Sequence, residues 1–119
     1  MVSKMFIKHI DDVKKVTKVL GETATFQIFW EGEDQPKTMK SDTHFVKITI
    51  PPEGTNTVHV HEDQEQIYII LEGKGNIQVG DEKAMVKAGD AVFLPIQVPH
   101  GFFNTSKITA KILLVSIRV

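Results

Sequence analysis

Two histidines one residue apart, His59 and His61, open the stretch HVHEDQEQIYIILEGKG, which covers residues 59–75. Side chains alternate between the two faces of a β-strand, so residues at positions i and i+2 project to the same side. If the segment is extended, both imidazoles can reach one ion together. Imidazole nitrogen suits several divalent transition metals, so the spacing favours a metal site over two unrelated polar residues.

A third histidine, His100, lies in the stretch GDAVFLPIQVPHGFFN, residues 89–104. Phe102 and Asn104 share its face if that segment is extended. The remaining histidines, His9 and His44, lie outside both stretches, and we expect neither of them to bind the ion.

The elements that must position these residues are mostly short strands. From residue 23 onward, β-rich segments of about four to eight residues are separated by turn sequences such as PPEG, EGKG, GDEK and KAGD. About ten such segments predict an all-β sandwich or barrel. Residues 11–20, DDVKKVTKVL, are the exception: their apolar positions recur at helical spacing, with Gly21 to end the helix, and they predict a short N-terminal helix.

We expect a single domain, because 119 residues are too few for two ordinary domains. Within it, residues 1–42 form the N-terminal helix and strands that pack on a barrel of residues 43–119. The polar stretch of residues 31–42 is a long loop. Together with Trp30 it could cover the barrel mouth as a lid, or it could be a dimer contact or a solvated loop, and the sequence leaves these alternatives open.

Both histidine stretches resemble the two motifs of the cupin family, and the resemblance covers roughly residues 43–118. The first motif is matched by Gly54, His59, His61 and Gly73, and the second by Gly89, Pro95, His100 and Asn104. The resemblance implies an antiparallel double-stranded β-helix, or jelly roll, with the three histidines as metal ligands. The glycines are most simply turn residues with unusual backbone angles, and Asn104 is a structural hydrogen-bonding residue.

Two positions depart from the family pattern. Gln97 stands where the second motif usually has a glycine, and Gln66 stands where the first usually has a glutamate ligand. Alignment to Gly73 favours Gln66 as the fourth ligand, whereas ligand chemistry alone favours the neighbouring Glu65. The two side chains cannot both face the interior of an unbulged strand.

Three imidazoles and one oxygen suit one divalent transition metal per subunit; manganese or iron is favoured, and nickel, copper and zinc are alternatives. With neutral Gln66 the metal keeps its full positive charge, which favours small anionic, oxygen-rich ligands such as oxalate or a 2-oxo acid. The candidates to line an apolar substrate pocket are Tyr68, Ile70, Phe93 and Phe102. Phe103 is a further candidate. Tyr68 and Glu65 are the candidates for a catalytic role.

The resemblance implies a metalloenzyme with dioxygenase-like or oxalate decarboxylase-like chemistry. The alternative is a non-catalytic module that binds or senses a small ligand, because the same barrel hosts many activities. A decarboxylase needs a proton donor near the metal, and only Glu65 is a candidate for that position. This slightly favours metal-activated oxygen chemistry.

Composition excludes several other classes of protein. With 14 basic and 15 acidic residues the net charge is −1, and no basic patch suggests a nucleic-acid partner. The absence of cysteine excludes disulfides and thiolate ligands. No apolar run is long enough for a membrane span or a secretion signal, so we expect a soluble cytoplasmic protein. Apolar edge strands, together with the family resemblance, predict a homodimer.

Overall fold

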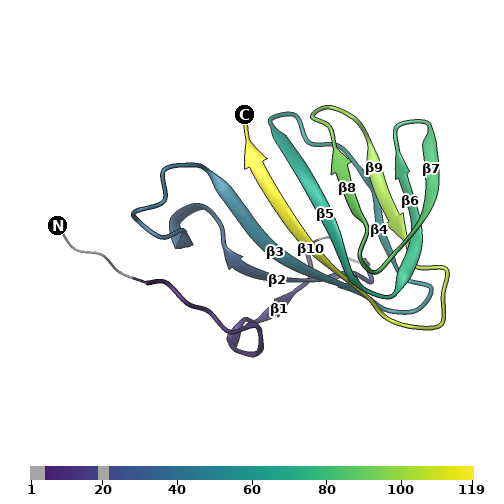
Figure 1. Cartoon of the computed structure of the whole chain (residues 1–119), viewed down its shortest axis with the longest axis horizontal. Coiled ribbons are helices and arrows are strands. Elements are labelled where there is room, and N and C mark those ends of the chain that lie inside the picture. The colour runs from purple at the N-terminus through teal and green to yellow at the C-terminus, as the bar shows by residue number, and fades with distance from the viewer. Residues whose placement is uncertain (1–4, 19–21) are drawn as a thin grey trace.

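The computed structural model describes residues 5–18 and 22–119 and is built from β-strands (Figure 1). In that part of the chain there are ten strands and two short 3₁₀ turns, Ile10–Asp12 and Gly32–Asp34. The strands are β1 (Lys15–Val16), β2 (Thr25–Trp30), β3 (Thr43–Ile50), β4 (Thr55–His59), β5 (Gln64–Glu72), β6 (Lys74–Val79), β7 (Glu82–Lys87), β8 (Ala91–Leu94), β9 (His100–Phe103) and β10 (Ala110–Arg118).

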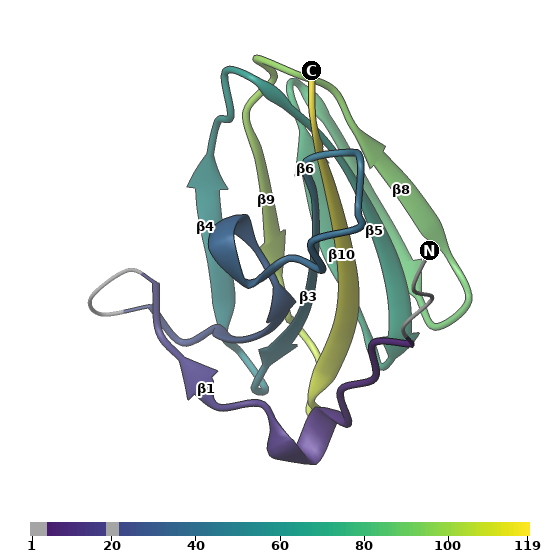
Figure 2. The same ribbon diagram turned by 90° about the vertical axis from the view of Figure 1, so that its left-hand side faces the viewer.

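These strands form two antiparallel sheets. The larger sheet has the order β1-β2-β3-β10-β5-β8, and the smaller has the order β4-β9-β6-β7. From β3 onward the chain passes repeatedly from one sheet to the other, and Figure 2 shows β4 and β9 facing the strands of the larger sheet. This arrangement confirms the predicted double-stranded β-helix.

The core fills the space between the two sheets. Along β3 and β10 every second side chain is buried, and the register places Ile48 opposite Ile112 and Val46 opposite Leu114. The smaller sheet contributes Phe102, which is completely buried. Each fully buried aliphatic or aromatic side chain stabilises the fold by about 1.5–3 kcal/mol, so these alternating positions supply much of the driving force for closing the barrel.

The predicted helix over residues 11–20 is wrong for the residues that the structure describes. A 3₁₀ turn at residues 10–12 leads into β1, where Val16 pairs with Phe26 of β2; Val19 and Leu20 lie outside the described residues. A ten-residue helix is marginal alone, and β-branched residues lower its stability further. The edge of β2 offers backbone partners instead, and the Gln27 amide donates hydrogen bonds to the carbonyl oxygens of Ile10 and Val13, both at 3.0 Å.

The outer face of the larger sheet carries an apolar row. Ile67 lies opposite both Phe93 and Val115, and Val115 lies opposite Phe45. Phe93 is 53% exposed and the other three side chains are partly exposed. The homodimer expected from the sequence stays a prediction. No helix within residues 5–18 and 22–119 has the length and apolar character needed to cross a membrane.

Two of the predicted turn glycines adopt left-handed backbone angles, Gly73 with φ of +80° and Gly89 with φ of +96°. Gly54 does not, and its constraint is space: a Cβ atom there would lie 2.7 Å from Thr23 Oγ1 and 2.9 Å from the Pro51 carbonyl oxygen. The expectation of an unusual backbone angle is therefore confirmed at two positions and wrong at Gly54.

Gly75, the second residue of β6, is required by the packing of the Phe102 ring. A Cβ atom at this position would meet Phe102 Cζ, with Cε1 at 2.6 Å and the Phe103 carbonyl oxygen at 2.8 Å. We expect Gly75→Ala to lower the free energy of unfolding by about 1–3 kcal/mol, because the buried ring has no free space to move into. Urea unfolding measures this change. Met85→Ala on the paired strand β7, where Met85 is 61% exposed, is the control and should leave stability nearly unchanged. Equal stability of the two variants would contradict the packing argument.

Candidate metal centre

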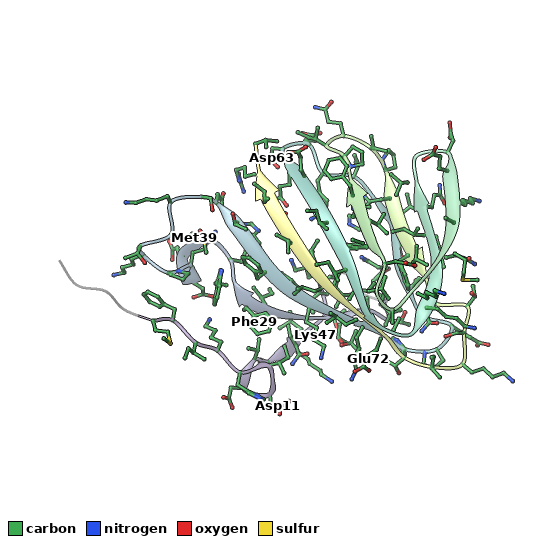
Figure 3. All side chains as sticks on the ribbon, in the orientation of Figure 1. Asp11, Phe29, Met39, Lys47, Asp63 and Glu72 are labelled. Carbon is green, nitrogen blue, oxygen red and sulfur yellow. The ribbon has the colours of Figure 1, made fainter. Side chains whose placement is uncertain are left out.

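The structure brings His59, His61 and His100 together at one end of the barrel. His59 ends β4, His100 begins β9, and the two residues are partners in the register of those strands. His61 lies two residues beyond His59 in the connection to β5. Figure 3 shows Asp63 of this connection at the end of the sheet where β10 terminates, with Glu72 at the opposite end.

The geometry of the three rings is compact enough for one ion. Ring centroids lie 4.9 Å apart for His59 and His61, 4.4 Å for His59 and His100, and 5.4 Å for His61 and His100. Each residue offers a nitrogen that lies within 4.8 Å of the other two. The cluster could therefore hold a metal ion, as the sequence predicted. Neither His9 nor His44 belongs to it.

Backbone carbonyl groups fix which nitrogen of two rings faces inward. His59 Nδ1 lies 2.7 Å from the Thr57 carbonyl oxygen, and His100 Nδ1 lies 3.1 Å from that of Val98. A carbonyl oxygen can only accept, so both Nδ1 atoms carry the proton and both Nε2 atoms keep a lone pair. His100 Nε2 is buried and has no hydrogen-bond partner among the described residues.

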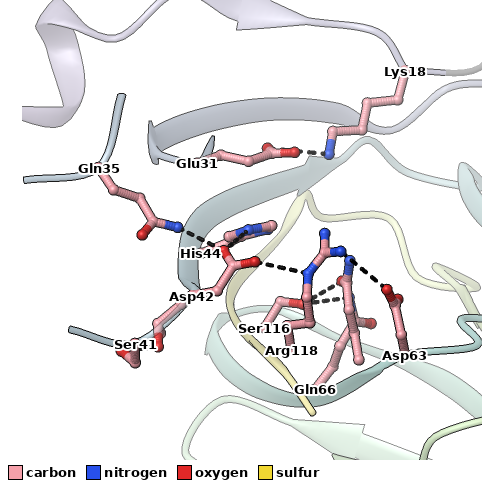
Figure 4. A network of polar contacts seen from close by, with 12 residues as sticks. Lys18, Glu31, Gln35, Ser41, Asp42, His44, Asp63, Gln66, Ser116 and Arg118 are labelled. Atoms are coloured by element: carbon pink, nitrogen blue, oxygen red, sulfur yellow. Dashed lines mark hydrogen bonds and ion pairs between the residues drawn. The ribbon is translucent and has the colours of Figure 1, made fainter. Parts of the chain in front are cut away.

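Gln66 presents a second unpaired acceptor. Its side chain is on the buried face of β5 with Tyr68, and its amide nitrogen donates to Ser116 Oγ at 3.3 Å. The Ser116 hydroxyl in turn donates to Gln64 Oε1 at 2.6 Å, and Figure 4 shows Gln66 beside Ser116. Neither of these two hydrogen bonds involves Gln66 Oε1, which is buried and has no hydrogen-bond partner among the described residues. An unpaired buried acceptor costs about 1–3 kcal/mol, which a bound cation would offset.

Glu65, the rival fourth ligand and catalytic candidate, lies on the other face of β5. It pairs in register with Ile117, and the one irregularity between β5 and β10 falls between Lys111 and Ile112, far from this position. Strand alternation therefore sends Glu65 away from the cavity and Gln66 into it. Glu65 is not among the residues that line the cavity, so the structure does not place this catalytic candidate beside the cluster.

A cavity of about 780 Å³ adjoins the histidine cluster, and its wall includes His59, His61, Gln66 and Tyr68. The other predicted pocket residues do not line it. Ile70 and Phe102 are buried in the core, and Phe93 points outward because Leu94 takes the inner position on β8. Phe103 lies in a shallow groove on the outside of the smaller sheet. Aromatic character alone suggested Phe93, but strand alternation decides its direction.

Tyr68 is a fixed, neutral group in the cavity wall. Its hydroxyl oxygen accepts a hydrogen bond from Asn56 Nδ2 at 3.0 Å, and the side chain is 1% exposed. Burial raises the pKa of Tyr68 far above its ordinary value, and the hydrogen bond from Asn56 opposes this only in part. The phenol therefore keeps its proton and can orient a ligand but cannot act as a base.

Burial favours the neutral form of two histidines of the cluster, His100 and His61. Desolvation, followed by repulsion from the other two histidines, lowers the pKa of His100 to about 4, although the hydrogen bond to Val98 opposes it. Desolvation likewise lowers the pKa of His61, with repulsion from His59 and Lys18 as further causes. Neutral imidazoles are the form that binds a metal.

Two further motif residues have structural roles. The Asn104 amide donates to the carbonyl oxygens of Ile50 at 3.0 Å and Ile108 at 2.8 Å, and its oxygen accepts from Ser106. Gln97 has a φ of +62°, where the family pattern has glycine, and its N–H donates to the His61 carbonyl oxygen at 2.8 Å. The backbone of His61 is thus held by a strained residue.

The sequence interpretation missed the polar groups on the rest of the cavity wall. His44 lines the cavity from β3 and is hydrogen bonded to Asp42 Oδ1 at 2.9 Å. Its alternation with the buried Val46 was the signal that could have found it. At the mouth, Glu31 lies 3.7 Å from Lys18. Glu31 begins the loop of residues 31–42, whose role as a lid stays a prediction.

Comparisons with known proteins agree with this geometry. A family model described as "Cupin domain" matches residues 46–116, more than half of the chain. An uncharacterized protein of Methanocaldococcus jannaschii is 37% identical over 68% of the chain, and an "oxalate-binding protein" of Thermotoga maritima is 32% identical over 61% of it. The matched regions span 66% and 60% of those relatives, less than two thirds of each.

Among solved structures, a predicted oxalate decarboxylase of Thermotoga maritima has the same fold. It superimposes with a TM-score of 0.75 over 96% of this chain and 100% of that one, at 21% identity. At that identity the similarity concerns the fold alone.

The lowered pKa values of His100 and His61 predict acid sensitivity of the metal-free protein. Between the ordinary histidine pKa and the lowered folded-state value, the unfolded chain binds more protons than the folded one, so stability falls as pH falls from about 6.5 to about 4. We expect the chelator-treated protein to be ~1–2 kcal/mol less stable at about pH 5 than at about pH 7.5, measured by urea unfolding. The lowered pKa of Asp42 changes stability only at pH values below 3.8, the ordinary pKa of this carboxyl, and so does not contribute between about pH 5 and about pH 7.5.

The variant His100→Asn should show a flatter pH dependence, whatever its absolute stability. His9→Asn, at a largely exposed position, should keep the wild-type slope. A wild-type protein equally stable at both pH values would contradict the prediction.

Proposed function

Because the chain belongs to the cupin family, we propose that it is a metal-dependent enzyme that holds one divalent transition metal and acts on a small anionic substrate. The proposed ligands are His59, His61, His100 and Gln66. The observation that carries the proposal is the pair of buried, unpaired acceptors, His100 Nε2 and Gln66 Oε1, beside two further imidazoles. A cation bound by the histidines and by Gln66 would satisfy both acceptors, and no protein donor among the described residues does so.

The donor set suits manganese or iron best, with nickel, copper and zinc as alternatives. Three imidazole nitrogens and one amide oxygen are neutral ligands of intermediate softness. Lacking thiolates, the set is unlike the usual closed structural zinc site. Such a set of four protein ligands would leave room on the ion for a substrate or a small molecule such as dioxygen.

The charge of the site supports the proposed substrate class. None of the four ligands is anionic, so the cation's charge is not neutralised by its own ligands and attracts a carboxylate in a partly dry cavity. An oxyanion such as oxalate or a 2-oxo acid would offer two oxygen ligands to such a cation. The name of the Thermotoga maritima relative, an oxalate-binding protein, supports the same class.

A bound divalent metal would supply Lewis-acid polarisation of a ligand oxygen and, for a redox-active ion, activation of dioxygen. The chain's own residues position the reactants. Tyr68 directs its hydroxyl toward Asn56, so this part of the wall is rigid. Val46, Ile48 and Leu114 line the cavity and limit water around the ligand.

The second candidate function is a non-catalytic binding protein for the same anions. The observation that favours it is the name of the relative, which specifies binding and no reaction. To separate the enzyme from the binding protein, the metal-loaded protein is incubated with oxalate, and oxygen consumption and carbon dioxide release are recorded. Oxalate binding without oxygen consumption or carbon dioxide release favours the non-catalytic binding protein.

Elemental analysis of the purified protein tests the metal site. We expect near-stoichiometric manganese, iron, nickel, copper or zinc in the wild type and its loss in His59→Ala/His61→Ala, because two of the four ligands are removed. His9→Ala/Lys8→Ala is the control outside the cavity and should retain the metal. A wild-type protein that contains no metal and takes none up on reconstitution would refute the proposal.

Because Gln66 donates a hydrogen bond to Ser116, we expect Ser116 to influence how tightly the protein binds the metal. Ser116→Ala removes the acceptor that fixes the amide, so the direction of the amide oxygen is no longer set by this hydrogen bond. We expect metal affinity to fall about tenfold, measured by competition with a chromophoric chelator. Ser41→Ala, which removes a hydroxyl remote from Gln66, should leave the affinity unchanged. Equal affinity of Ser116→Ala and wild type would show that Ser116 does not position the ligand.

A further inference from the structure

We propose that His44, oriented by Asp42, is the residue that exchanges a proton with the substrate in the cavity. The inference rests on the function proposed above, because it requires an anion held near the histidine cluster. His44 is 8% exposed, lies on the inner face of β3 and lines the same cavity as His59 and Gln66. The sequence interpretation gave it no role.

The strand register places His44 and the proposed ligand Gln66 in one row of the larger sheet, two strands apart. Ser116 of β10 lies opposite His44 of β3 and also opposite Gln66 of β5. Neighbouring strands are about 4.8 Å apart, so the two backbones are separated by about 10 Å, with both side chains on the inner face. His44 is not one of the clustered metal-binding residues. A substrate of a few heavy atoms that binds beside Gln66 can extend along this row to the His44 ring.

Asp42 determines which nitrogen of His44 carries the proton. Its Oδ1 accepts from Gln35 Nε2 and lies 2.9 Å from His44 Nε2, while its Oδ2 lies 2.7 Å from Arg118 Nε (Figure 4). The hydrogen bonds from Gln35 and His44, together with the charge of Arg118, lower the pKa of Asp42, so it is a carboxylate and can only accept. In the neutral ring Nε2 therefore carries the proton and Nδ1 keeps the lone pair.

This arrangement gives a reversible proton transfer. With a substrate that carries a hydroxyl group, such as glycolate, Nδ1 accepts the proton of that hydroxyl, so that an O–H bond breaks and an N–H bond forms, and the Asp42 carboxylate stabilises the resulting imidazolium. The same Nδ1–H returns the proton to the product, so no oxidant or reductant is consumed. A buried histidine held by a carboxylate is a common form of general acid–base group.

Other charged groups line the same cavity. The Glu22 carboxylate accepts hydrogen bonds from Thr57, including its N–H at 2.6 Å. Glu31 lies 3.7 Å from Lys18, but its Oε2 has no hydrogen-bond partner in the described part of the chain. Among these groups and Tyr68, which holds its proton too strongly, His44 is the one that a carboxylate holds in a single tautomer.

Calorimetry of anion binding tests the role without requiring turnover. The manganese(II)-loaded protein is titrated with oxalate, glycolate and pyruvate in two buffers that differ in ionisation enthalpy, which gives the number of protons taken up per anion bound. We expect proton uptake by the wild type, because the bound anion favours the imidazolium form of His44. In His44→Gln, whose amide can still donate to Asp42 but cannot titrate, uptake should fall at least threefold and affinity about tenfold.

Elemental analysis and thermal unfolding of each variant accompany the titrations. His9→Gln is the matched control at an exposed histidine, and it should take up protons as the wild type does. If His44→Gln does not fold or loses manganese, Asp42→Asn takes its place and should also reduce the uptake, because the imidazolium loses its counter-ion.

The outcomes separate this inference from the function on which it rests. Anion binding with the same proton uptake in wild type and His44→Gln would overturn the role of His44 and leave the proposed function standing. A change in thermal stability alone, with unchanged uptake, would assign His44 and Asp42 to holding Arg118 and would likewise overturn it. Failure of all three anions to bind the manganese-loaded wild type would refute the proposed substrate class, and the inference with it.

Discussion

The insertion of β10 between β3 and β5 is the constraint on which the rest of the structure depends. This last strand pairs with both neighbours along most of its length, so it closes the larger sheet and fixes two registers at once. Because strand side chains alternate, these registers place His44, Ser116 and Gln66 in one inward row. A slip of one residue in either pairing would turn part of this row to the outer face. The core and the cavity wall therefore depend on the same backbone hydrogen bonds.

The site concentrates polar groups where an apolar core would be more stable. His100, Asn104, Ser116 and Gln66 are all less than a tenth exposed. Asn104 satisfies its amide with carbonyl groups of the strand ends, whereas His100 and Gln66 each leave one acceptor unpaired. This difference separates a residue that stabilises the barrel from residues whose cost is offset only by a ligand. The proposed metal would turn the same unpaired acceptors into a source of stability.

Two carboxylates, Asp42 and Asp63, hold residues near the proposed metal site without being among its proposed ligands. Asp42 contacts Gln35, His44 and Arg118, and Arg118 also contacts Asp63 in the connection that follows His61. The end of β10 is thus linked by charge both to the wall that carries His44 and to the segment that carries the histidine cluster. Ion pairs of Arg118 hold this end of β10, while the ligands of the proposed metal are neutral.

The sequence by itself determined the all-β fold, the position of most strands and the pair His59 and His61, because alternation and the HxH spacing are local properties of a strand. It added His100 only through the resemblance to the second cupin motif. It left Gln66 and Glu65 open, since both are polar, and only the pairing of β5 with β10 decided which one faces inward. It predicted a helix at residues 11–20, where the free edge of β2 offered better partners than an isolated helix. It placed Phe93 in the pocket and overlooked His44, because residue type is visible in the sequence, whereas the direction of a side chain is set by the neighbouring strands.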